Sequence, residues 1–515
     1  MSERKRWLAL YVLGLVVYGV ASLRVQSPGY MDADYYYATA LQLVDGKGLS
    51  EPFLWNYLDD PTSLPHTSHL YWMPLPTVLS AGSMLLLGSS FRAAQIPFIL
   101  LAAALSPLAA SFAQRLSRDG RLAWMAGLFA LSPGFFLPFL VTIDSFALFA
   151  IAGSLSLWLM ARAVESPSPG RWLMAGLLIG LGSLARADGL LLFVIGALAV
   201  IWSGKTRISG GVLLFLGLLA VMGPWWARNV AQTGTALNSG SQRLLWMLNY
   251  DDLFAFPASQ LTLARWWEAG LLAAASARLA ALATNLQRLI AEAGIVFLAP
   301  FMAVGAARKW DHPFVRLGIG YLAMLFMVMT FVFPFVGPRG ALFHSMVAVV
   351  PMLWALAPIG LKAAIYWLGS KRKWNQKEAW RVLGTSAVVM AAVLTVGLYA
   401  NRFLDGGNSW NASAETYRTV AAAISDQGES VVAVNNPPGF FAHSQQPAVV
   451  IPNGTDDALH KVVDAYAVRW VVLEANHPQG LDSLYSKPES VEWLRLYRTI
   501  ADGTERPVYV LEVVR

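Results

Sequence analysis

Apolar residues recur along the sequence in runs of about the length that crosses a bilayer. Because the hydrocarbon core of a bilayer takes about 20 apolar residues per helix, the pattern predicts a polytopic α-helical membrane protein with about 11 spans. The predicted spans cover residues 7–23, 92–113, 122–139, 145–161, 172–186, 189–203, 208–227, 290–306, 314–335, 341–361 and 382–400. A shorter run, 75–88, is bracketed by prolines and Gly88, and we interpret it as a re-entrant or interfacial segment. Counted as a full span, it would reverse the side of every later segment.

Three longer polar segments follow or separate the spans, at residues 24–74, 228–289 and 401–515. The second contains an amphipathic stretch, 263–289, of the kind that lies on a membrane surface. In the third, short β-branched runs alternate with helical patterns, which predicts a small α/β domain. We therefore expect a transmembrane domain at 1–400, with outer loops 24–74 and 228–289, and a second domain at 401–515.

Composition agrees with a chain that is surrounded largely by lipid. The 515 residues are 56% hydrophobic and 13% charged, whereas soluble domains carry about 25% charged residues. The formal net charge is +7, but the basic residues occupy short loops instead of one soluble surface, so we expect no nucleic-acid partner. The chain has no cysteine, which excludes disulfides, thiolate nucleophiles and cysteine-ligated zinc.

The short basic loops all fall on one side of the membrane when the N-terminus is cytoplasmic. These loops are 114–121, 162–171, 204–207 with Lys205 and Arg207, 307–313 and 362–381. Cytoplasmic loops of membrane proteins are enriched in Lys and Arg, so this distribution predicts that the five loops are inside. The outer loops and residues 401–515 then face outward, and we expect a plasma-membrane protein with an extracytoplasmic functional face.

Three acids at the outer ends of spans are candidate catalytic residues. Asp32 and Asp34 lie in the run Tyr30 to Tyr37 after the first span, and Asp144 lies at the outer end of the third full span. A carboxylate at the lipid–water boundary is partly desolvated, which raises its pKa and makes it a better base. Asp32 and Asp144 could instead be helix caps, and the three acids together could hold a divalent cation.

Cations on the same face are candidate phosphate ligands, because guanidinium groups pair well with phosphate. Arg228 ends a span in the run Pro224 to Asn229, Arg339 lies in a tight turn, and His344 follows it by about one helical turn. Snorkelling to lipid headgroups is the alternative for Arg228, and a structural role is the alternative for His344.

Together these residues resemble the GT-C superfamily of membrane glycosyltransferases, in the branch of protein mannosyltransferases and lipid A aminoarabinose transferases. The resemblance extends over most of the chain. It rests on the order of Asp32, Tyr35, Tyr36, Ala40 and Gly46, then Met73-Pro74-Leu75-Pro76, Leu184 to Gly189, the Pro-Trp and Arg-Asn pairs of 224–229, and Leu248 to Asp252. Relatives often carry Lys or His immediately before the proline turn, where this chain has Trp72-Met73, so His69 or His66 is a candidate replacement for that phosphate contact.

The resemblance implies an inverting glycosyltransferase that moves a sugar from a polyprenyl-phosphate donor to an acceptor hydroxyl outside the cell. It implies Asp32 as the base, Asp34 as a helper and Asp144 as the second acid. Arg228, Arg339, His344 and His69 would bind the donor phosphate. The acceptor would be a lipid, a glycan or a protein, and a divalent cation held by Asp32, Asp34 and Asp144 is one option for a cofactor.

Two other classes of protein remain open from the sequence. A polytopic transporter or lipid flippase would also have many spans, although transporters usually show inverted repeats and charged residues at mid-membrane. Here the charges gather at the outer ends of spans, apart from Arg186 and Asp188. A catalytically silent scaffold that presents residues 401–515 is the third class.

Overall fold

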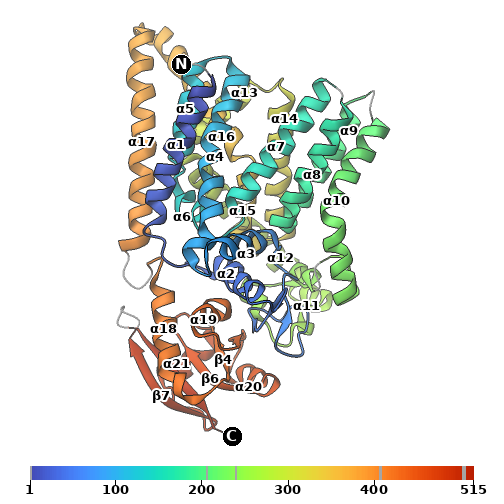
Figure 1. Ribbon diagram of the computed structural model, residues 1–515, viewed down its shortest axis with the longest axis vertical. Helices are drawn as coiled ribbons and strands as arrows, with labels where there is room; N and C mark the ends of the chain where they lie inside the picture. The colour runs from blue at the N-terminus through green and yellow to red at the C-terminus, as the bar shows by residue number, and fades with distance from the viewer. Residues whose placement is uncertain are drawn as a thin grey trace.

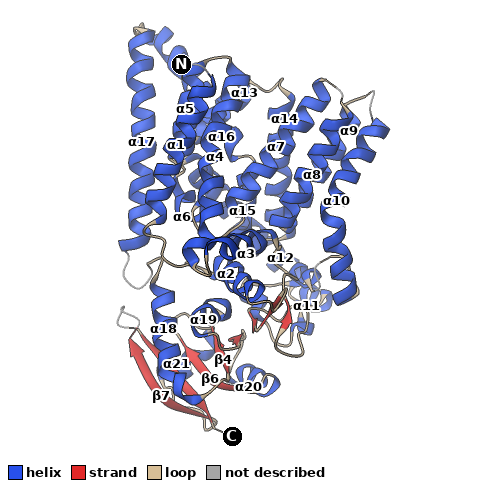
Figure 2. Cartoon of the chain, in the orientation of Figure 1, coloured by secondary structure: helices blue, strands red, loops and turns tan. Residues whose placement is uncertain are grey.

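The computed structural model describes residues 3–166, 168–204, 207–237, 240–404, 409–501 and 506–514. Upright helices form a bundle, and a unit with a β-sheet packs at one end of it, which we call the sheet end (Figures 1 and 2). The N-terminus lies at the opposite end of the bundle (Figure 1). Lys205, part of one predicted cytoplasmic loop, lies outside the described residues.

Seven helices of the described chain are long and apolar enough to cross a membrane. They are α1 (Glu3–Ser22), α4 (Phe91–Ser117), α7 (Phe146–Glu165), α10 (Arg207–Thr233), α14 with its continuation (Pro313–Val332), α16 (Val350–Arg372) and α17 (Gln376–Leu404). The bent pair Gly120–Leu131 (α5) and Gly134–Leu140, which includes α6 (Leu137–Leu140), raises the number to eight if it is one span. The protein is therefore an integral membrane protein, and its helices agree with the apolar pattern.

Three of the predicted spans fall on shorter helices. Residues 172–186 lie in α8 (Pro169–Ala185) except for the last one, residues 189–203 lie mostly in α9 (Leu190–Trp202), and residues 290–306 end in α13 (Ala299–Arg308). Their lengths do not by themselves qualify them as spans, so the number of about 11 stays a prediction. The apolar run at 75–88 forms α3 (Leu75–Leu87), which lies beside α2 (Met31–Val44) at the sheet end (Figure 1). This position fits the interfacial interpretation.

Small residues let neighbouring helices of the bundle approach closely. A Cβ atom on Gly176 of α8 would lie 2.1 Å from the carbonyl oxygen of Leu214 on α10. A Cβ atom on Gly360 of α16 would lie 1.9 Å from the carbonyl oxygen of Phe301 on α13. Lipid tails are as apolar as leucine, so helix association in a membrane depends on such close packing.

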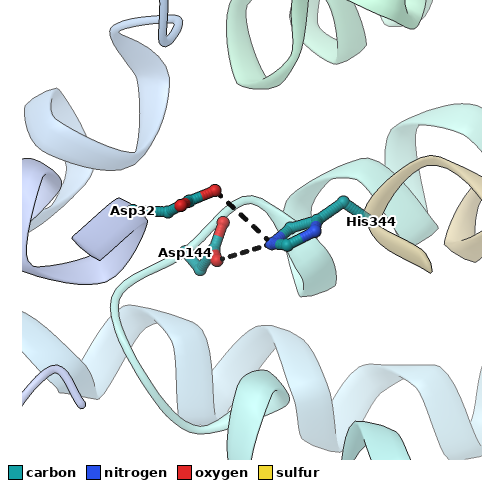
Figure 3. Close-up of side chains that lie close together, drawn as sticks. All are labelled: Asp32, Asp144 and His344. Atoms are coloured by element: carbon teal, nitrogen blue, oxygen red, sulfur yellow. Dashed lines mark hydrogen bonds and ion pairs between the residues drawn. The ribbon is translucent and has the colours of Figure 1, made fainter. Parts of the chain in front are cut away.

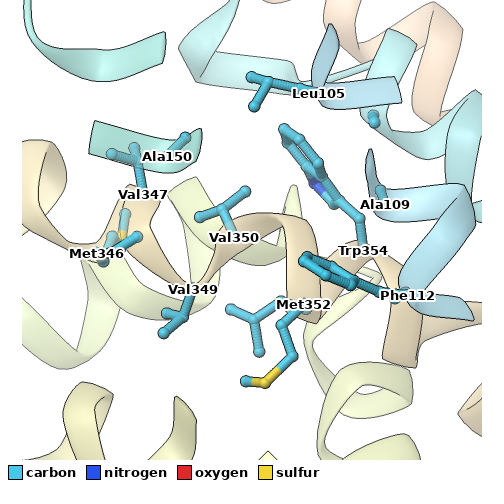
Figure 4. Close-up of a cluster of buried hydrophobic side chains, with 14 of the residues drawn as sticks. Leu105, Ala109, Phe112, Ala150, Met346, Val347, Val349, Val350, Met352 and Trp354 are labelled. Carbon is cyan, nitrogen blue, oxygen red and sulfur yellow. The ribbon is translucent and has the colours of Figure 1, made fainter. Parts of the chain in front are cut away.

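Large side chains fill the centre of the same bundle. Figure 4 shows Trp354 of α16 among Leu105, Phe112 and Met352. Trp354 is 2% exposed and Met352 is fully buried. This dense core holds the ends of the helices, and therefore the residues beyond those ends, in fixed relative positions.

The C-terminal unit contains a six-stranded sheet with the strand order β2-β5-β4-β6-β8-β7. Its strands are β4 (Val431–Val434), β5 (Ala448–Val450), β6 (Val468–Leu473), β7 (Leu494–Ala501), β8 (Pro507–Val513) and, from the first outer loop, β2 (Phe53–Leu54). The neighbours from β2 to β6 are parallel, and β8 and β7 are antiparallel additions. The helices α18 (Ala412–Ile424), α19 (Pro437–Ser444) and α20 (Asp456–Ala465) accompany the strands.

A C-terminal sheet was predicted, but the participation of the first outer loop was not. β2 pairs with β5 through Phe53 opposite Ala448 and Leu54 opposite Val449. The sheet therefore links the first outer loop to the end of the chain. The amphipathic stretch of the second outer loop forms α11 (Leu263–Glu268) and α12 (Gly270–Arg288).

Candidate active site

A cavity of about 1120 Å³ opens between the bundle and the outer loops. Its lining combines aromatic and aliphatic side chains with a set of charged ones: Asp32, Arg186, Asp188, Arg288, Glu292, Arg339, His344 and Arg402. A large apolar cavity with a few convergent polar groups is the usual form of a ligand site. We therefore consider this cavity the candidate active site.

Three of the predicted site residues meet in or beside this cavity. Asp32 is the second residue of α2, Asp144 lies just before α7, and His344 belongs to the short helix α15 (Leu342–Ser345). The Nε2 atom of His344 lies 3.3 Å from Oδ2 of Asp144 and 3.7 Å from Oδ2 of Asp32 (Figure 3). The bundle thus brings together side chains that are far apart in the sequence.

His344 is oriented by its own turn of backbone. Its Nδ1 atom lies 2.9 Å from the carbonyl oxygen of Gly340, so Nδ1 carries a hydrogen and donates it. Gly340 has a φ of +149°, a conformation that side chains disfavour. Because Nδ1 is engaged in this way, Nε2 is the atom that faces the two carboxylates.

The two carboxylates have different surroundings. Asp144 is 1% exposed, and it accepts hydrogen bonds from the backbone amide of Ser145, from the Ser145 hydroxyl at 2.8 Å and from the hydroxyl of Tyr30. The Asp32 side chain is 28% exposed, and its nearest charged partner is His344. Burial raises the pKa of Asp32 although the positive charge of His344 opposes the change. Asp144 is therefore a fixed, fully bonded group, whereas Asp32 keeps lone pairs directed at the cavity.

The helix-capping alternatives for these acids do not agree with the structure. α2 begins at Met31, its N-cap residue is Tyr30, and no side chain caps it. The N-cap residue of α7 is Ser145, and Asp144 bonds the amide of Ser145 itself instead of an amide inside the first turn. Neither acid therefore acts as the N-cap that the sequence allowed.

Two of the cavity arginines have no carboxylate partner within the described residues. Arg339 places its guanidinium 4.5 Å from the ring centroid of Tyr250, and Arg402 lies 5.9 Å from that of Phe139. By contrast, Arg186 pairs with Asp188 at 3.0 Å, and Arg288 pairs with Glu292 at 2.7 Å. Arg339 and Arg402 are consequently the cations that remain available to an anionic ligand.

The structure does not bring Arg228, His69 or Asp34 to the cavity lining. Arg228 donates to the carbonyl oxygens of Leu49 and Ser68, at 3.3 and 2.9 Å, and so holds the first outer loop. His69 is fully buried, and burial lowers its pKa to about 3, so it is neutral.

Asp34 lies on the other side of α2 from Asp32, because two residues correspond to about 200° of helix rotation. Its carboxylate accepts a hydrogen bond from Asn436 at 2.8 Å. The group of potential metal ligands consists of Asp32, Asp144 and His344, without Asp34.

Known proteins resemble this chain in sequence over part of its length and in structure over nearly all of it. The family of dolichyl-phosphate-mannose-protein mannosyltransferases matches residues 71–227. Two crystal structures of ArnT from Cupriavidus metallidurans, apo and bound to undecaprenyl phosphate, superpose with TM-scores of 0.61 and 0.60 at 13% identity. They cover 99% of this chain, and 99% and 98% of their own chains. The chain therefore shares the fold of this GT-C transferase.

A second relative supports the same GT-C fold. The oligosaccharyltransferase AglB from Archaeoglobus fulgidus, in complex with an inhibitory peptide and a dolichol-phosphate, has a TM-score of 0.58 at 11% identity. It covers 91% of this chain and 69% of its own. Another structure of the A. fulgidus enzyme, with Zn and sulfate, has a TM-score of 0.56 at 13% identity, over 90% of this chain and 68% of its own. No curated protein sequence matches the chain.

Several residues of this cavity were not predicted as site residues. Arg402 lies near the end of α17, Tyr30 precedes Asp32, Arg288 lies near the end of the amphipathic stretch, and Glu292 lies just beyond it. Arg186 and Asp188 did give a signal, since a charged pair inside an apolar run is costly and usually functional. Tyr30 gave none, because its hydrogen bond to Asp144 joins residues 114 positions apart.

Proposed function

We propose that this GT-C protein transfers a sugar from a polyprenyl-phosphate donor to an acceptor hydroxyl, with Asp32 as the general base. The donor class is supported by the relatives, since ArnT was crystallised with undecaprenyl phosphate and AglB with a dolichol-phosphate. The observation that carries the role of Asp32 is its exposure: it is the carboxylate of the Asp32–Asp144–His344 group whose oxygens face the cavity.

The chemistry needs one base and no separate acid. Asp32 accepts the proton of the acceptor hydroxyl while that oxygen attacks the anomeric carbon. The bond from the anomeric carbon to the phosphate oxygen breaks, and its electron pair leaves with the lipid phosphate, which is already a stable anion. A single displacement of this kind inverts the anomeric centre. The raised pKa of Asp32 makes it a stronger base than an exposed aspartate.

Arg339 and Arg402 would stabilise the phosphate as charge develops on it. Both line the cavity and neither has a carboxylate partner among the described residues. Cations positioned before the reaction are a large source of rate enhancement. Asp144 would hold His344, and through it Asp32, because its own oxygens are bonded to protein donors.

A divalent cation fits the same three side chains. Nε2 of His344 and the carboxylate oxygens of Asp32 and Asp144 lie within 4.8 Å of one another, and oxygen and imidazole ligands suit zinc. Bound there, the ion would supply Lewis acidity. If it is required, removal of divalent ions with a chelator abolishes turnover, and adding back Zn²⁺, Mn²⁺ or Mg²⁺ restores it.

The extracytoplasmic orientation in the plasma membrane is part of the proposal. α16 ends at Arg372 and α17 begins at Gln376, so the basic segment between them lies at the bundle end opposite the sheet (Figure 1). Basic loops mark the cytoplasmic side, which supports a cavity that opens outward. Accessibility of an introduced cysteine to a membrane-impermeant thiol reagent tests this, since the chain has no cysteine of its own.

The decisive experiment compares Asp32→Asn with Asp45→Asn in nanodiscs. The reaction contains undecaprenyl-phosphate sugars and a membrane extract as the source of acceptor, and released undecaprenyl phosphate is measured. Asp45 lies at the other end of α2 and is 46% exposed, so it is a matched control. General-base catalysis contributes about 10²–10⁴-fold, so Asp32→Asn should lose that factor while Asp45→Asn keeps wild-type turnover. Full turnover by Asp32→Asn would refute the assignment, and lipid translocation without donor consumption would favour a flippase.

A further inference from the structure

The buried carboxylate of Asp34 is not used by the mechanism. Asp34 is 5% exposed, and its Oδ2 atom accepts a hydrogen bond from Nδ2 of Asn436 at 2.8 Å. No Lys or Arg among the described residues forms an ion pair with it. Burying such a group is costly without compensation, so its position between α2 and the C-terminal unit calls for a role.

Asn436 connects Asp34 to the start of a helix. Its Oδ1 atom accepts a hydrogen bond from the amide of Gly439 at 3.1 Å, which caps α19. A Cβ atom on Gly439 would lie 2.9 Å from Oδ2 of Asp34 and 2.7 Å from Nδ2 of Asn436. Only glycine at 439 lets the carboxylate approach this helix end, where the helix dipole favours a negative charge.

The surroundings of this polar pair are apolar and pack α2 against the C-terminal unit. Tyr35 and Tyr36 of α2 belong to one buried cluster with Tyr417 of α18 and Phe440 and Phe441 of α19. Apolar contacts alone tolerate small sliding movements, whereas a directional hydrogen bond inside them specifies one register. Figure 1 shows α19 beside α2 at the sheet end.

We infer that the Asp34–Asn436 hydrogen bond sets the position of α2 against the C-terminal unit and thereby places Asp32 in the cavity. Asp34 is then a positioning residue, and the C-terminal unit contributes to the placement of Asp32 through Asn436. The consequence for catalysis rests on the proposed function, whereas the docking of α2 does not.

The test removes the bond while keeping the helix cap. Asn436→Ser leaves a good N-cap residue but a side chain too short to reach Asp34. The double variant Asp34→Asn with Asn436→Asp reverses donor and acceptor and keeps the bond. Asn435→Ser is the matched control. The side-chain amide of Asn435 donates to the carbonyl oxygen of Asn476, so this bond lies within the C-terminal unit and does not reach α2.

Turnover should separate these variants. A displacement of about 1 Å can cost about 10²-fold in rate, so Asn436→Ser should lose about that factor in kcat. The variant should bind undecaprenyl phosphate with the wild-type stoichiometry and Kd, because the proposed phosphate ligands Arg339 and Arg402 do not lie on α2. The reversed pair and Asn435→Ser should keep kcat close to wild type. Wild-type kcat in Asn436→Ser, or equal loss in the reversed pair, would overturn the inference.

A second measurement tests the position of α2 against the C-terminal unit and does not depend on transferase activity. Spin labels at Lys47→Cys, after α2, and Thr419→Cys, on α18, report the distance between the two parts, since the chain has no native cysteine. Asn436→Ser should broaden the distance distribution, and the reversed pair should keep it narrow. An unchanged distribution in Asn436→Ser overturns the docking role. A broadened one together with no transferase activity in any variant would leave the docking role standing and reject the proposed function.

Discussion

His66 gives the first outer loop a predicted dependence on pH. It lies in β3 (His66–Thr67), opposite Glu51 of β1 (Ser50–Glu51). Its Nε2 atom lies 3.2 Å from Oδ2 of Asp59, and its Nδ1 atom lies 3.6 Å from Oε1 of Glu51. Glu51 also accepts a hydrogen bond from Tyr35 of α2 at 2.6 Å, so this group of charges connects the loop to the helix that carries Asp32.

The magnitude follows from the pKa of His66. Burial favours the neutral imidazole, but Asp59 and Glu51 outweigh it and raise the pKa to about 9 from an ordinary value of 6.5. A pKa difference of one between the folded and unfolded loop corresponds to about 1.4 kcal/mol. The rise from 6.5 to about 9 therefore corresponds to about 3 kcal/mol of loop stability. Because the folded pKa is raised, the contribution is fully present below pH 6.5 and is lost as the pH rises through 9.

Amide hydrogen exchange measures the effect. The reporter is the amide of Ser68, which donates to the carbonyl oxygen of Leu49 in the same loop. After correction for intrinsic exchange, the opening free energy of wild type should exceed that of His66→Gln at pH 6.5, and the difference should vanish above pH 9. His460→Gln is the control, because His460 is 46% exposed and pairs with an exposed aspartate. A difference between wild type and His66→Gln that does not change with pH would refute the reasoning.

Three further predictions concern the cavity and the bundle. Arg339→Ala and Arg402→Ala should each weaken the binding of undecaprenyl phosphate by at least about tenfold, because each removes a charge-assisted hydrogen bond. Calorimetry in nanodiscs measures the Kd, and an unchanged Kd would contradict the prediction. Tyr30→Phe removes one hydrogen bond to Asp144 and should lower kcat by about tenfold, with no change in the KM for the sugar donor. An unchanged kcat would contradict the prediction. Gly360→Ala forces a methyl group against the carbonyl oxygen of Phe301 and should destabilise the bundle by about 3 kcal/mol. Thermal unfolding should show a lower Tm. An unchanged Tm would show that the two helices can move apart at no cost.

The fold was predictable where the sequence signal is local. Each apolar run along the chain coincides at least in part with a helix, and the expected GT-C-like fold is matched by solved structures over nearly the whole chain. β2 was not predictable, because Phe53 and Leu54 form a two-residue strand and their partners belong to the other end of the sequence. Two residues carry no alternation from which a strand can be read.

Some of the predicted site residues lie together at the cavity, whereas others lie away from it. Asp32 and Asp144 were expected at the same membrane face, and Arg339 and His344 were expected nearby. Asp32 faces the cavity and Asp34 faces away from it because of the rotation of α2. Predicting that rotation requires the residue at which the helix begins, Met31. The contacts that remove Arg228 from the cavity are two backbone carbonyls in a distant loop, and no sequence pattern marks them.

The strand β2 also has a consequence for how the protein is made. Its partner strand is synthesised about 400 residues later, which at about 5–20 residues per second is a delay of about 20–80 seconds. During that time Phe53 and Leu54 lack the strand with which they pair in the finished protein. A chain truncated before Ala448 should therefore reach the membrane with β2 unpaired.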